Sequence, residues 1–86
     1  HRAAAPHIYA TLHAAVSKSQ EMTPAQLKAW VTAEVERNPL LKVIYYQSVD
    51  ARTMQEVATW DDSPRIQGCI AVQAGDIRLI DNICIR

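Results

Sequence analysis

Asp81 is the residue of this chain whose setting most suggests a special role, because it stands inside an apolar run. Residues 78–82 read Arg-Leu-Ile-Asp-Asn, and Ile-Cys-Ile follows at residues 83–85. A carboxylate on the buried side of a strand is costly unless it is paired or hydrogen-bonded. Asp81 could contact a ligand or a neighbouring domain. Alternatively, it could accept backbone N–H groups at a helix N-terminus or in the turn after the first strand. We favour the second role, which predicts that Asp81→Asn or Asp81→Ala lowers stability by about 1–3 kcal/mol.

The histidines and glycines do not have the spacing of a metal site or a phosphate loop. His7 and His13 are six residues apart, whereas metal-binding pairs on a helix are separated by three or four. We therefore interpret His1, His7 and His13 as solvated side chains. Gly68 and Gly75 are the only glycines, so no glycine-rich loop is present to bind phosphate.

Cys69 and Cys84 could form a disulfide or remain thiols. Neither lies at an expected helix N-terminus or beside a base in sequence, so a catalytic nucleophile is disfavoured. The pattern of a disulfide-rich scaffold is absent, and we expect two buried thiols in a reducing compartment.

The remaining candidates are an acidic pair and two tryptophans. Asp61 and Asp62 could bind a cation, but an acidic pair before Ser-Pro is more typical of a solvated loop. Trp30 has helical spacing and is expected in the core, whereas Trp60 could stack on a ligand.

Composition limits the possible partners. The chain has 86 residues, 49% of them hydrophobic, and nine basic residues balance nine acidic ones. A net charge of zero argues against nucleic acid and anionic membranes as partners. The sequence has no apolar run near the roughly 20 residues of a membrane span. We expect one domain, residues 1–86, cut or processed from a longer chain because no initiator Met is present.

The periodicity predicts two helices, at about residues 6–19 and 24–38. The first has an apolar stripe, and the second begins with a Thr23 N-cap, a proline and a capping-box glutamine. It should end at Asn38-Pro39. The stripe of the first helix consists of Ile8, Tyr9, Leu12, Ala15 and Val16, and that of the second of Leu27, Trp30, Val31, Glu34 and Val35.

Three strands are predicted at about residues 43–49, 66–74 and 77–85, the last two joined by a Gly75-Asp76 hairpin turn. Pairing Ala74 with Ile77 places Ile70 opposite Asp81. The face that the helices should cover then holds Ile66, Ile70, Val72, Ile77, Leu79, Asp81, Ile83 and Ile85. The opposite face holds Gln67, Cys69, Ala71, Gln73, Arg78, Ile80, Asn82 and Cys84. The prediction is an α+β fold of two layers. An antiparallel helix pair packs on one face of a three-stranded, mainly antiparallel sheet.

Two stretches resemble the pantoate–β-alanine ligase family. Its members carry a strand close to Asp-Tyr-Val-Glu-Leu-Val-Asp-Pro-x-Thr-Leu, which matches residues 44–54, Ile-Tyr-Tyr-Gln-Ser-Val-Asp-Ala-Arg-Thr-Met. They end with an apolar strand, a short turn and Thr-Arg-Leu-Ile-Asp-Asn, which matches residues 69–82. Residues 2–6 resemble the helix that leads out of the family's nucleotide-binding domain. Gln47, Ala51 and Gly68 depart from the usual glutamate, proline and larger apolar residue.

The resemblance implies a cytoplasmic enzyme that uses ATP and magnesium to adenylate pantoate and then joins the acyl group to β-alanine. This chain would be its C-terminal lid, facing the enzyme's own N-terminal nucleotide-binding domain. Residues 1–86 would then contain no catalytic, cofactor-binding or metal-binding residue. The isolated chain would be inactive and could self-associate through its uncovered surface.

The alternative is a free-standing α+β module that binds a protein partner through its sheet. An ATP-binding domain encoded upstream of His1 would favour the lid, and a start codon near His1 would favour the module.

Overall fold

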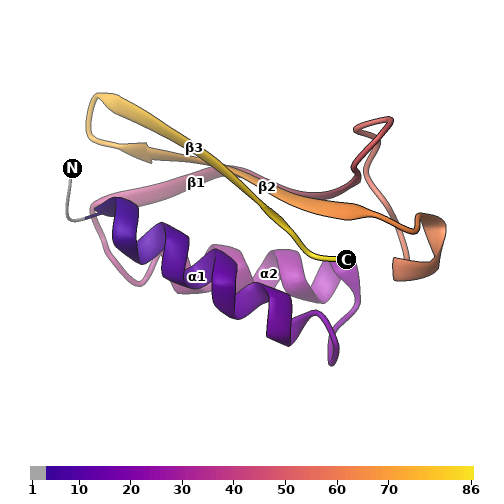
Figure 1. The fold of residues 1–86 in the computed structure, drawn as a ribbon. Coiled ribbons are helices and arrows are strands. Elements are labelled where there is room, and N and C mark those ends of the chain that lie inside the picture. The colour runs from indigo at the N-terminus through magenta and orange to yellow at the C-terminus, as the bar shows by residue number, and fades with distance from the viewer. Residues whose placement is uncertain (1–3) are drawn as a thin grey trace.

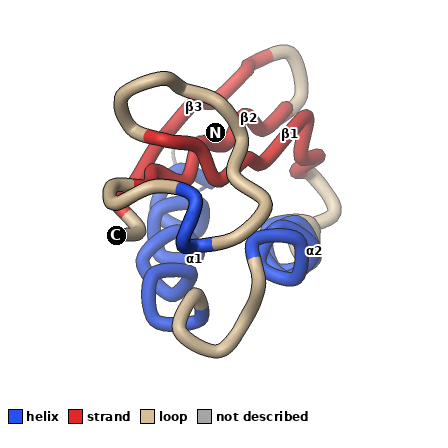
Figure 2. The backbone as a smooth tube through the Cα atoms, turned by 90° about the vertical axis from the view of Figure 1, so that its right-hand side faces the viewer, coloured by secondary structure: helices blue, strands red, loops and turns tan. Residues whose placement is uncertain are grey.

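The computed structural model describes residues 4–86, which form two layers, a helix pair beneath a three-stranded sheet (Figure 1). The helices are α1 (Ala4–Lys18) and α2 (Pro24–Val35), and the strands are β1 (Leu41–Asp50), β2 (Ile66–Ala74) and β3 (Ile77–Cys84). A short 3₁₀ helix, η1 (Trp60–Asp62), lies between β1 and β2. Both helices lie on one side of the sheet, as Figure 2 shows. The predicted α+β architecture is confirmed.

The start of α2 is fixed by the predicted capping box. The Thr23 hydroxyl accepts the N–H of Gln26 at 3.2 Å, and the Gln26 side chain accepts the N–H of Thr23 at 3.0 Å. The helix ends at Val35, three residues before the predicted end. The Glu36 N–H still donates to the Thr32 carbonyl, but the bonds of Arg37 N–H to Glu34 and Asn38 N–H to Val35 span three residues and form a turn.

Helix α1 presents a narrower apolar stripe than the sequence suggested. Ile8, Leu12 and Ala15 are buried, but Tyr9, predicted to widen the stripe, is 53% exposed. Thr11 is buried beside these apolar residues, and its hydroxyl donates to the His7 carbonyl at 2.9 Å. A threonine can be buried in a helix because this bond satisfies its hydroxyl. Within residues 4–86 no helix has the length and apolar character required to cross a bilayer.

The sheet is antiparallel with the order β1-β2-β3. The predicted hairpin register is confirmed, since Ala74 pairs with Ile77 and Ile70 with Asp81. Gly75 has φ 62°, the left-handed value that a glycine-first hairpin turn needs. Strand β1 extends to Leu41 and Asp50 at its two ends, beyond the predicted 43–49.

A bulge in β1 decides which of its side chains face the helices. The register shifts between Val43 and Tyr45, so Ile44 is an extra residue without a partner on β2. Tyr46 consequently points into the core and is 1% exposed, whereas Tyr45 lies on the opposite face and is 40% exposed. The sequence alone did not indicate this bulge.

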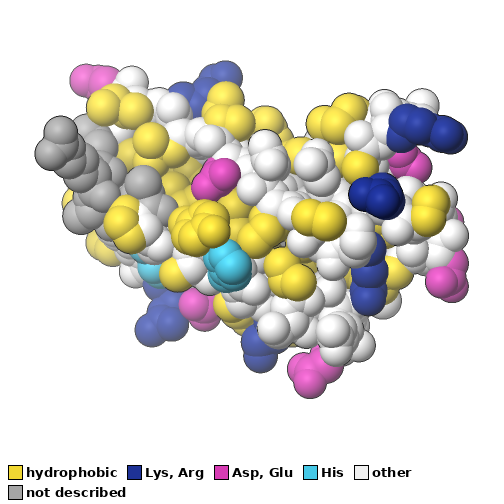
Figure 3. All heavy atoms as spheres, in the orientation of Figure 1, with side chains coloured by type: hydrophobic (Ala, Val, Ile, Leu, Met, Phe, Trp, Pro, Cys, Tyr) yellow, Lys and Arg dark blue, Asp and Glu magenta, His cyan; other side chains and the backbone are white. Residues whose placement is uncertain are grey.

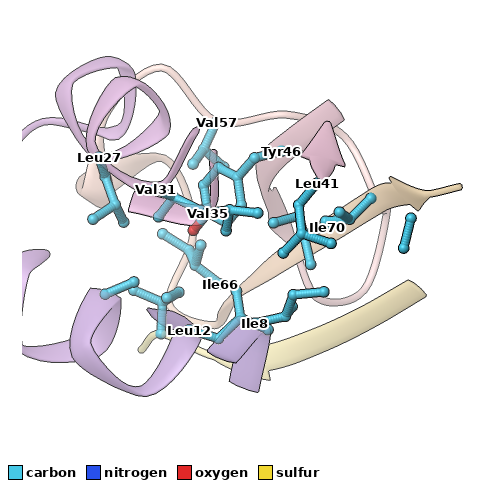
Figure 4. Packing of buried hydrophobic residues seen from close by; sticks show 14 residues of the cluster. Ile8, Leu12, Leu27, Val31, Val35, Leu41, Tyr46, Val57, Ile66 and Ile70 are labelled. Carbon is cyan, nitrogen blue, oxygen red and sulfur yellow. The ribbon is translucent and has the colours of Figure 1, made fainter. Parts of the chain in front are cut away.

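The core lies between the helices and the sheet (Figure 4). It includes Ile66, Ile70, Val72 and Ile85 from the predicted core face of the hairpin. Ile77 was assigned to the same face but is 43% exposed at the hairpin end. The other buried members are Ile8, Leu12, Ala15, Leu27, Val31, Val35, Leu41, Tyr46, Val57 and Ala74.

Candidate functional site

The strand motif at the end of β1 leads into a turn organised by the Asp50 carboxylate. Asp50 Oδ1 accepts the N–H groups of Arg52 at 2.7 Å and Thr53 at 2.9 Å. The Asp50 carbonyl accepts the N–H of Met54 at 2.8 Å, and Met54 has φ 63°. This left-handed value is uncommon for a residue with a side chain, so the hydrogen bonds of Asp50 hold the turn in an unusual conformation.

The same turn perturbs the acidity of Asp50. A hydrogen bond from the Ser63 hydroxyl, followed by those from the N–H groups of Thr53 and Arg52, holds the pKa of Asp50 below its usual value. The Ser63 hydroxyl oxygen also lies 2.8 Å from the Arg65 carbonyl oxygen, so its single proton has two competing acceptors. Asp50 is therefore an ionised structural acceptor, and it is not suited to act as a general base at neutral pH.

A surface hollow lies beside this turn, between the end of β1 and the start of β2. The Ala51 N–H donates to the Arg65 carbonyl at 2.9 Å, which joins the two sides of the hollow. Its walls could contact a polar or anionic group through two guanidinium groups, but they supply no nucleophile. The lining residues are Asp50, Ala51, Arg52, Ser63, Pro64 and Arg65.

Asp81 lies on β3 at the predicted register but not in the predicted surroundings. Its side chain is only half-buried, and Oδ1 accepts the N–H of the adjacent Asn82 at 2.8 Å. No helix N-terminus or β1 turn within residues 4–86 donates to it, so the predicted backbone partners were wrong. The expected loss of 1–3 kcal/mol was based on those partners, and one exposed local bond supports a smaller loss of about 0.5–1.5 kcal/mol.

The histidines lie apart and have local partners. His7 Nε2 lies 3.0 Å from the Glu34 carbonyl oxygen and so links α1 to α2, which makes His7 a contact between helices and not a solvated side chain. His13 Nε2 lies 2.8 Å from the Tyr9 hydroxyl on the surface. His1 lies outside the described residues. Among residues 4–86 no three His, Cys, Asp or Glu side chains gather as metal ligands would.

Both cysteines are free thiols, but the expectation that both are buried was wrong. Cys84 is exposed, and Cys69 is half-buried on the face of the sheet opposite the helices. Cys69 pairs with Asn82 and Cys84 with Gln67, the diagonal placement that the register predicted. Partial burial raises the pKa of the Cys69 thiol, which makes it a poorer nucleophile.

Of the two exposed aspartates in the acidic pair, only Asp62 accepts hydrogen bonds within residues 4–86. Asp62 Oδ2 accepts the N–H groups of Ala58 at 2.9 Å and Thr59 at 3.1 Å, and Oδ1 accepts the Thr59 hydroxyl at 3.1 Å. These bonds, with the Thr59 N–H the largest contributor, lower the pKa of Asp62. Both carboxylates are exposed, as the predicted solvated loop requires, and that of Asp62 in addition closes η1.

The tryptophans have structural contacts. Trp30 is half-buried against the core, with the Lys18 ammonium 5.8 Å from its ring centroid. Trp60 also packs against the core, and its Nε1 donates to the Met22 carbonyl at 2.7 Å. Trp60 also lines a surface hollow between η1 and the turn that joins the helices, so its stacking on a ligand stays a prediction.

Among the buried polar groups that sequence reasoning missed is the Tyr46 hydroxyl. It lies 3.4 Å from the Ser48 hydroxyl, and burial raises the pKa of Tyr46. A Cβ atom on Gly68 would lie 2.6 Å from this hydroxyl oxygen. The sequence contained a sign of this polar pair, since the family motif has valine and leucine at the positions of Tyr46 and Ser48.

Comparison with known proteins identifies the family. The family model described as pantoate-beta-alanine ligase matches residues 1–84. The chain belongs to the pantoate–β-alanine ligase family. Both motif stretches, residues 44–54 and 69–82, fall inside this match.

The relatives of this ligase-family chain are named pantothenate synthetases. That of Porphyromonas gingivalis is 38% identical over 82 residues, which are 95% of this chain and 29% of the relative. That of Bacteroides thetaiotaomicron is 41% identical over 61 residues, 71% of this chain and 22% of the relative. The matched part of such relatives is their C-terminal portion. The chain thus spans less than a third of the length of these ligase-family members.

The fold is also that of a solved member of the ligase family. The crystal structure of pantothenate synthetase from Thermus thermophilus superposes with a TM-score of 0.79 at 22% identity. The superposition covers 93% of this chain and 29% of the other. The two helices and three strands are therefore shared with this part of a ligase-family structure.

Proposed function

We propose that residues 1–86 are the C-terminal domain of a pantoate–β-alanine ligase, which uses ATP to adenylate pantoate and joins the acyl group to β-alanine. The observation that carries this proposal is the family match over residues 1–84. It is supported by the sheet register, which places both family motifs on neighbouring strands of one sheet.

The role of the domain is that of a lid over a site formed elsewhere in the enzyme. A lid needs no catalytic group of its own. Asp50, Asp62 and Asp81 support this role, because their carboxylates accept hydrogen bonds from nearby backbone N–H groups and are not grouped around a reacting centre. A lid excludes water from a reactive acyl-adenylate, which would otherwise be hydrolysed.

The residues that the structure describes lack two features that bind ATP and magnesium in other proteins. Residues 4–86 contain neither a gathered set of metal ligands nor a glycine-rich loop. We therefore assign both to the N-terminal nucleotide-binding domain of the longer enzyme, which is the expected partner of this chain. The cytoplasmic location belongs to the same proposal, as the family resemblance implies.

The test compares the longer enzyme with a variant that lacks this segment. With pantoate, β-alanine, ATP and magnesium, the intact enzyme should release one AMP for each pantothenate formed. Without the lid, AMP should exceed pantothenate, because water hydrolyses the acyl-adenylate. An unchanged ratio at an unchanged rate would contradict the lid role.

A second test of the proposed function uses the isolated 86-residue chain. Isothermal titration with ATP, pantoate and magnesium should give no binding heat. Saturable binding of any of these to the chain alone would show that the segment contains a ligand site of its own, which contradicts the assignment to the N-terminal domain.

A further inference from the structure

The outer edge of β3 carries backbone groups that no strand of residues 4–86 pairs. In an antiparallel hairpin, alternate residues direct their N–H and C=O groups toward the partner strand. The two-residue turn makes Ala74 and Ile77 a hydrogen-bonded pair, so the backbone groups of odd-numbered β3 residues face β2. The Ile85 N–H, which donates to the Ile66 carbonyl at 2.8 Å, has the same parity. Even-numbered residues, including Ile80 and Asn82, therefore direct their backbone groups outward.

This edge has the properties of a strand that could pair with another chain. It is eight residues long, and the Ile80 side chain beside it is 67% exposed. Both helices lie in the layer beneath the sheet and do not extend over this edge (Figures 1 and 2). In the space-filling view, hydrophobic side chains gather over the part of the surface where the β2–β3 hairpin lies (Figure 3). Exposed strand edges are templates for edge-to-edge association unless a charge, a proline or a bulge blocks them. Arg78 places one exposed charge on β3 near the hairpin turn, four residues before Asn82.

Asp81 supplies such a block in an unusual way. The side chains of odd-numbered β3 residues point toward the core side of the sheet. The Asp81 side chain therefore does not point outward along the edge. Its carboxylate instead accepts the outward N–H of Asn82 at 2.8 Å. The donor that an incoming strand would need at Asn82 is thus already occupied by a charged acceptor, which makes a stronger bond than a neutral carbonyl.

We propose that Asp81 closes the β3 edge against pairing with the β3 strand of a second copy of this chain. The partner considered is a second copy, because the β3 edge of that copy has the same alternation of inward and outward backbone groups. In any antiparallel β3–β3 pairing, even-numbered residues of the two copies must exchange the hydrogen bonds. Every register that includes Asn82 therefore requires its N–H and must break the Asp81 bond.

The test uses Asp81→Ala, which removes both the acceptor and the charge. Sedimentation velocity should show self-association stronger than in the unaltered chain, by up to about tenfold for the loss of this one hydrogen bond. Asp61→Ala is the matched control, because it removes an exposed carboxylate away from the edge. It should behave as the unaltered chain does.

Two further variants separate the edge from other causes. Adding Ile80→Lys to Asp81→Ala should restore the monomer, because a lysine at an edge opposes strand pairing. Asp81→Asn keeps an oxygen that can accept the Asn82 N–H, so it should associate less than Asp81→Ala.

Amide hydrogen exchange tests the proposal without any substitution. In the unaltered chain the Asn82 N–H should exchange at least about tenfold more slowly than the outward N–H of Ile80, because only the first has an acceptor. Equal exchange rates would overturn the proposal. A folded Asp81→Ala chain that stays monomeric at every concentration tested would overturn it too.

Discussion

Asp50, Asp62 and Asp81 each direct a carboxylate oxygen to a backbone N–H no more than four residues away along the chain. Such bonds fix turns and strand ends locally. At the residue scale the acidic side chains therefore act on the shape of the backbone, as the lid proposal requires of a segment without catalytic groups.

The lowered pKa values of Asp50 and Asp62 predict a sensitivity to acid. A carboxyl group with a pKa below its unfolded value of about 4 stabilises the fold above that value, and the contribution is lost as pH falls toward the folded pKa. The thermal midpoint should fall between about pH 5 and pH 2. This fall should be smaller in Asp50→Asn/Asp62→Asn.

Asp61→Asn is the control for this acid series, because within residues 4–86 the Asp61 carboxylate accepts no hydrogen bond. Its thermal midpoint should follow that of the unaltered chain. An equal fall of the thermal midpoint in the double variant and the unaltered chain would contradict the prediction. The ionised Asp50 and Asp62 would then not stabilise the fold.

These local bonds could not be predicted from the sequence. The apolar surroundings of Asp81 marked it as unusual in the sequence, but the partners of Asp62 and Asp81 depend on backbone angles that residue types do not determine. The left-handed conformation at Met54 is an example, since methionine has no preference for it.

At the scale of elements, Tyr46, Ser48 and Gly68 form one packing unit across β1 and β2. Ser48 pairs directly with Gly68, and the Tyr46 ring lies over the glycine. The family motif has a valine, a leucine and a larger apolar residue at these three places. We infer that the tyrosine ring fills the volume that those larger neighbours occupy elsewhere in the family.

Gly68→Val should therefore destabilise the chain by about 1–3 kcal/mol, because its Cβ would lie 2.6 Å from the Tyr46 hydroxyl oxygen. Urea unfolding followed by circular dichroism measures this change. Gln67→Val on the same strand is the control for valine itself, since Gln67 lies on the face opposite the helices and is only half-buried.

Restoring the family residues together should reverse the loss. Tyr46→Val and Ser48→Leu in the Gly68→Val background should recover most of the stability, although each alone leaves a misfit. A triple variant no more stable than Gly68→Val would show that the three positions are not coupled.

The elements themselves followed from the sequence where local rules apply. The α2 capping box, both hairpin strands and their register were predicted, because caps and two-residue turns are specified by adjacent residues. The bulge at Ile44 and the exposure of Tyr9 were not predicted, because both depend on how the sheet and helices pack against each other.

At the scale of the whole molecule, three distant segments meet at one end. The Arg86 guanidinium donates to the Ser19 carbonyl at 3.0 Å and lies 5.0 Å from the centre of the Trp60 ring. Trp60 in turn donates to Met22. This junction connects the turn between the helices to η1 and to the residues after β3.

Trp60→Phe should lower the free energy of unfolding by about 1–2 kcal/mol more than Trp30→Phe. Both rings are half-buried, but only the first substitution leaves a carbonyl, that of Met22, without its donor. Chemical denaturation of both variants gives the comparison, and equal losses would show that the Met22 bond contributes nothing.

The strand order β1-β2-β3 also bears on the kinetics of folding. Each strand pairs with its neighbour in sequence, so the sheet can form by successive hairpins with small loop-closure entropies. Contact between α1 and β3 instead joins the two ends of the described chain. We therefore expect docking of α1 to be the late step of folding, after a sheet that already has its native register.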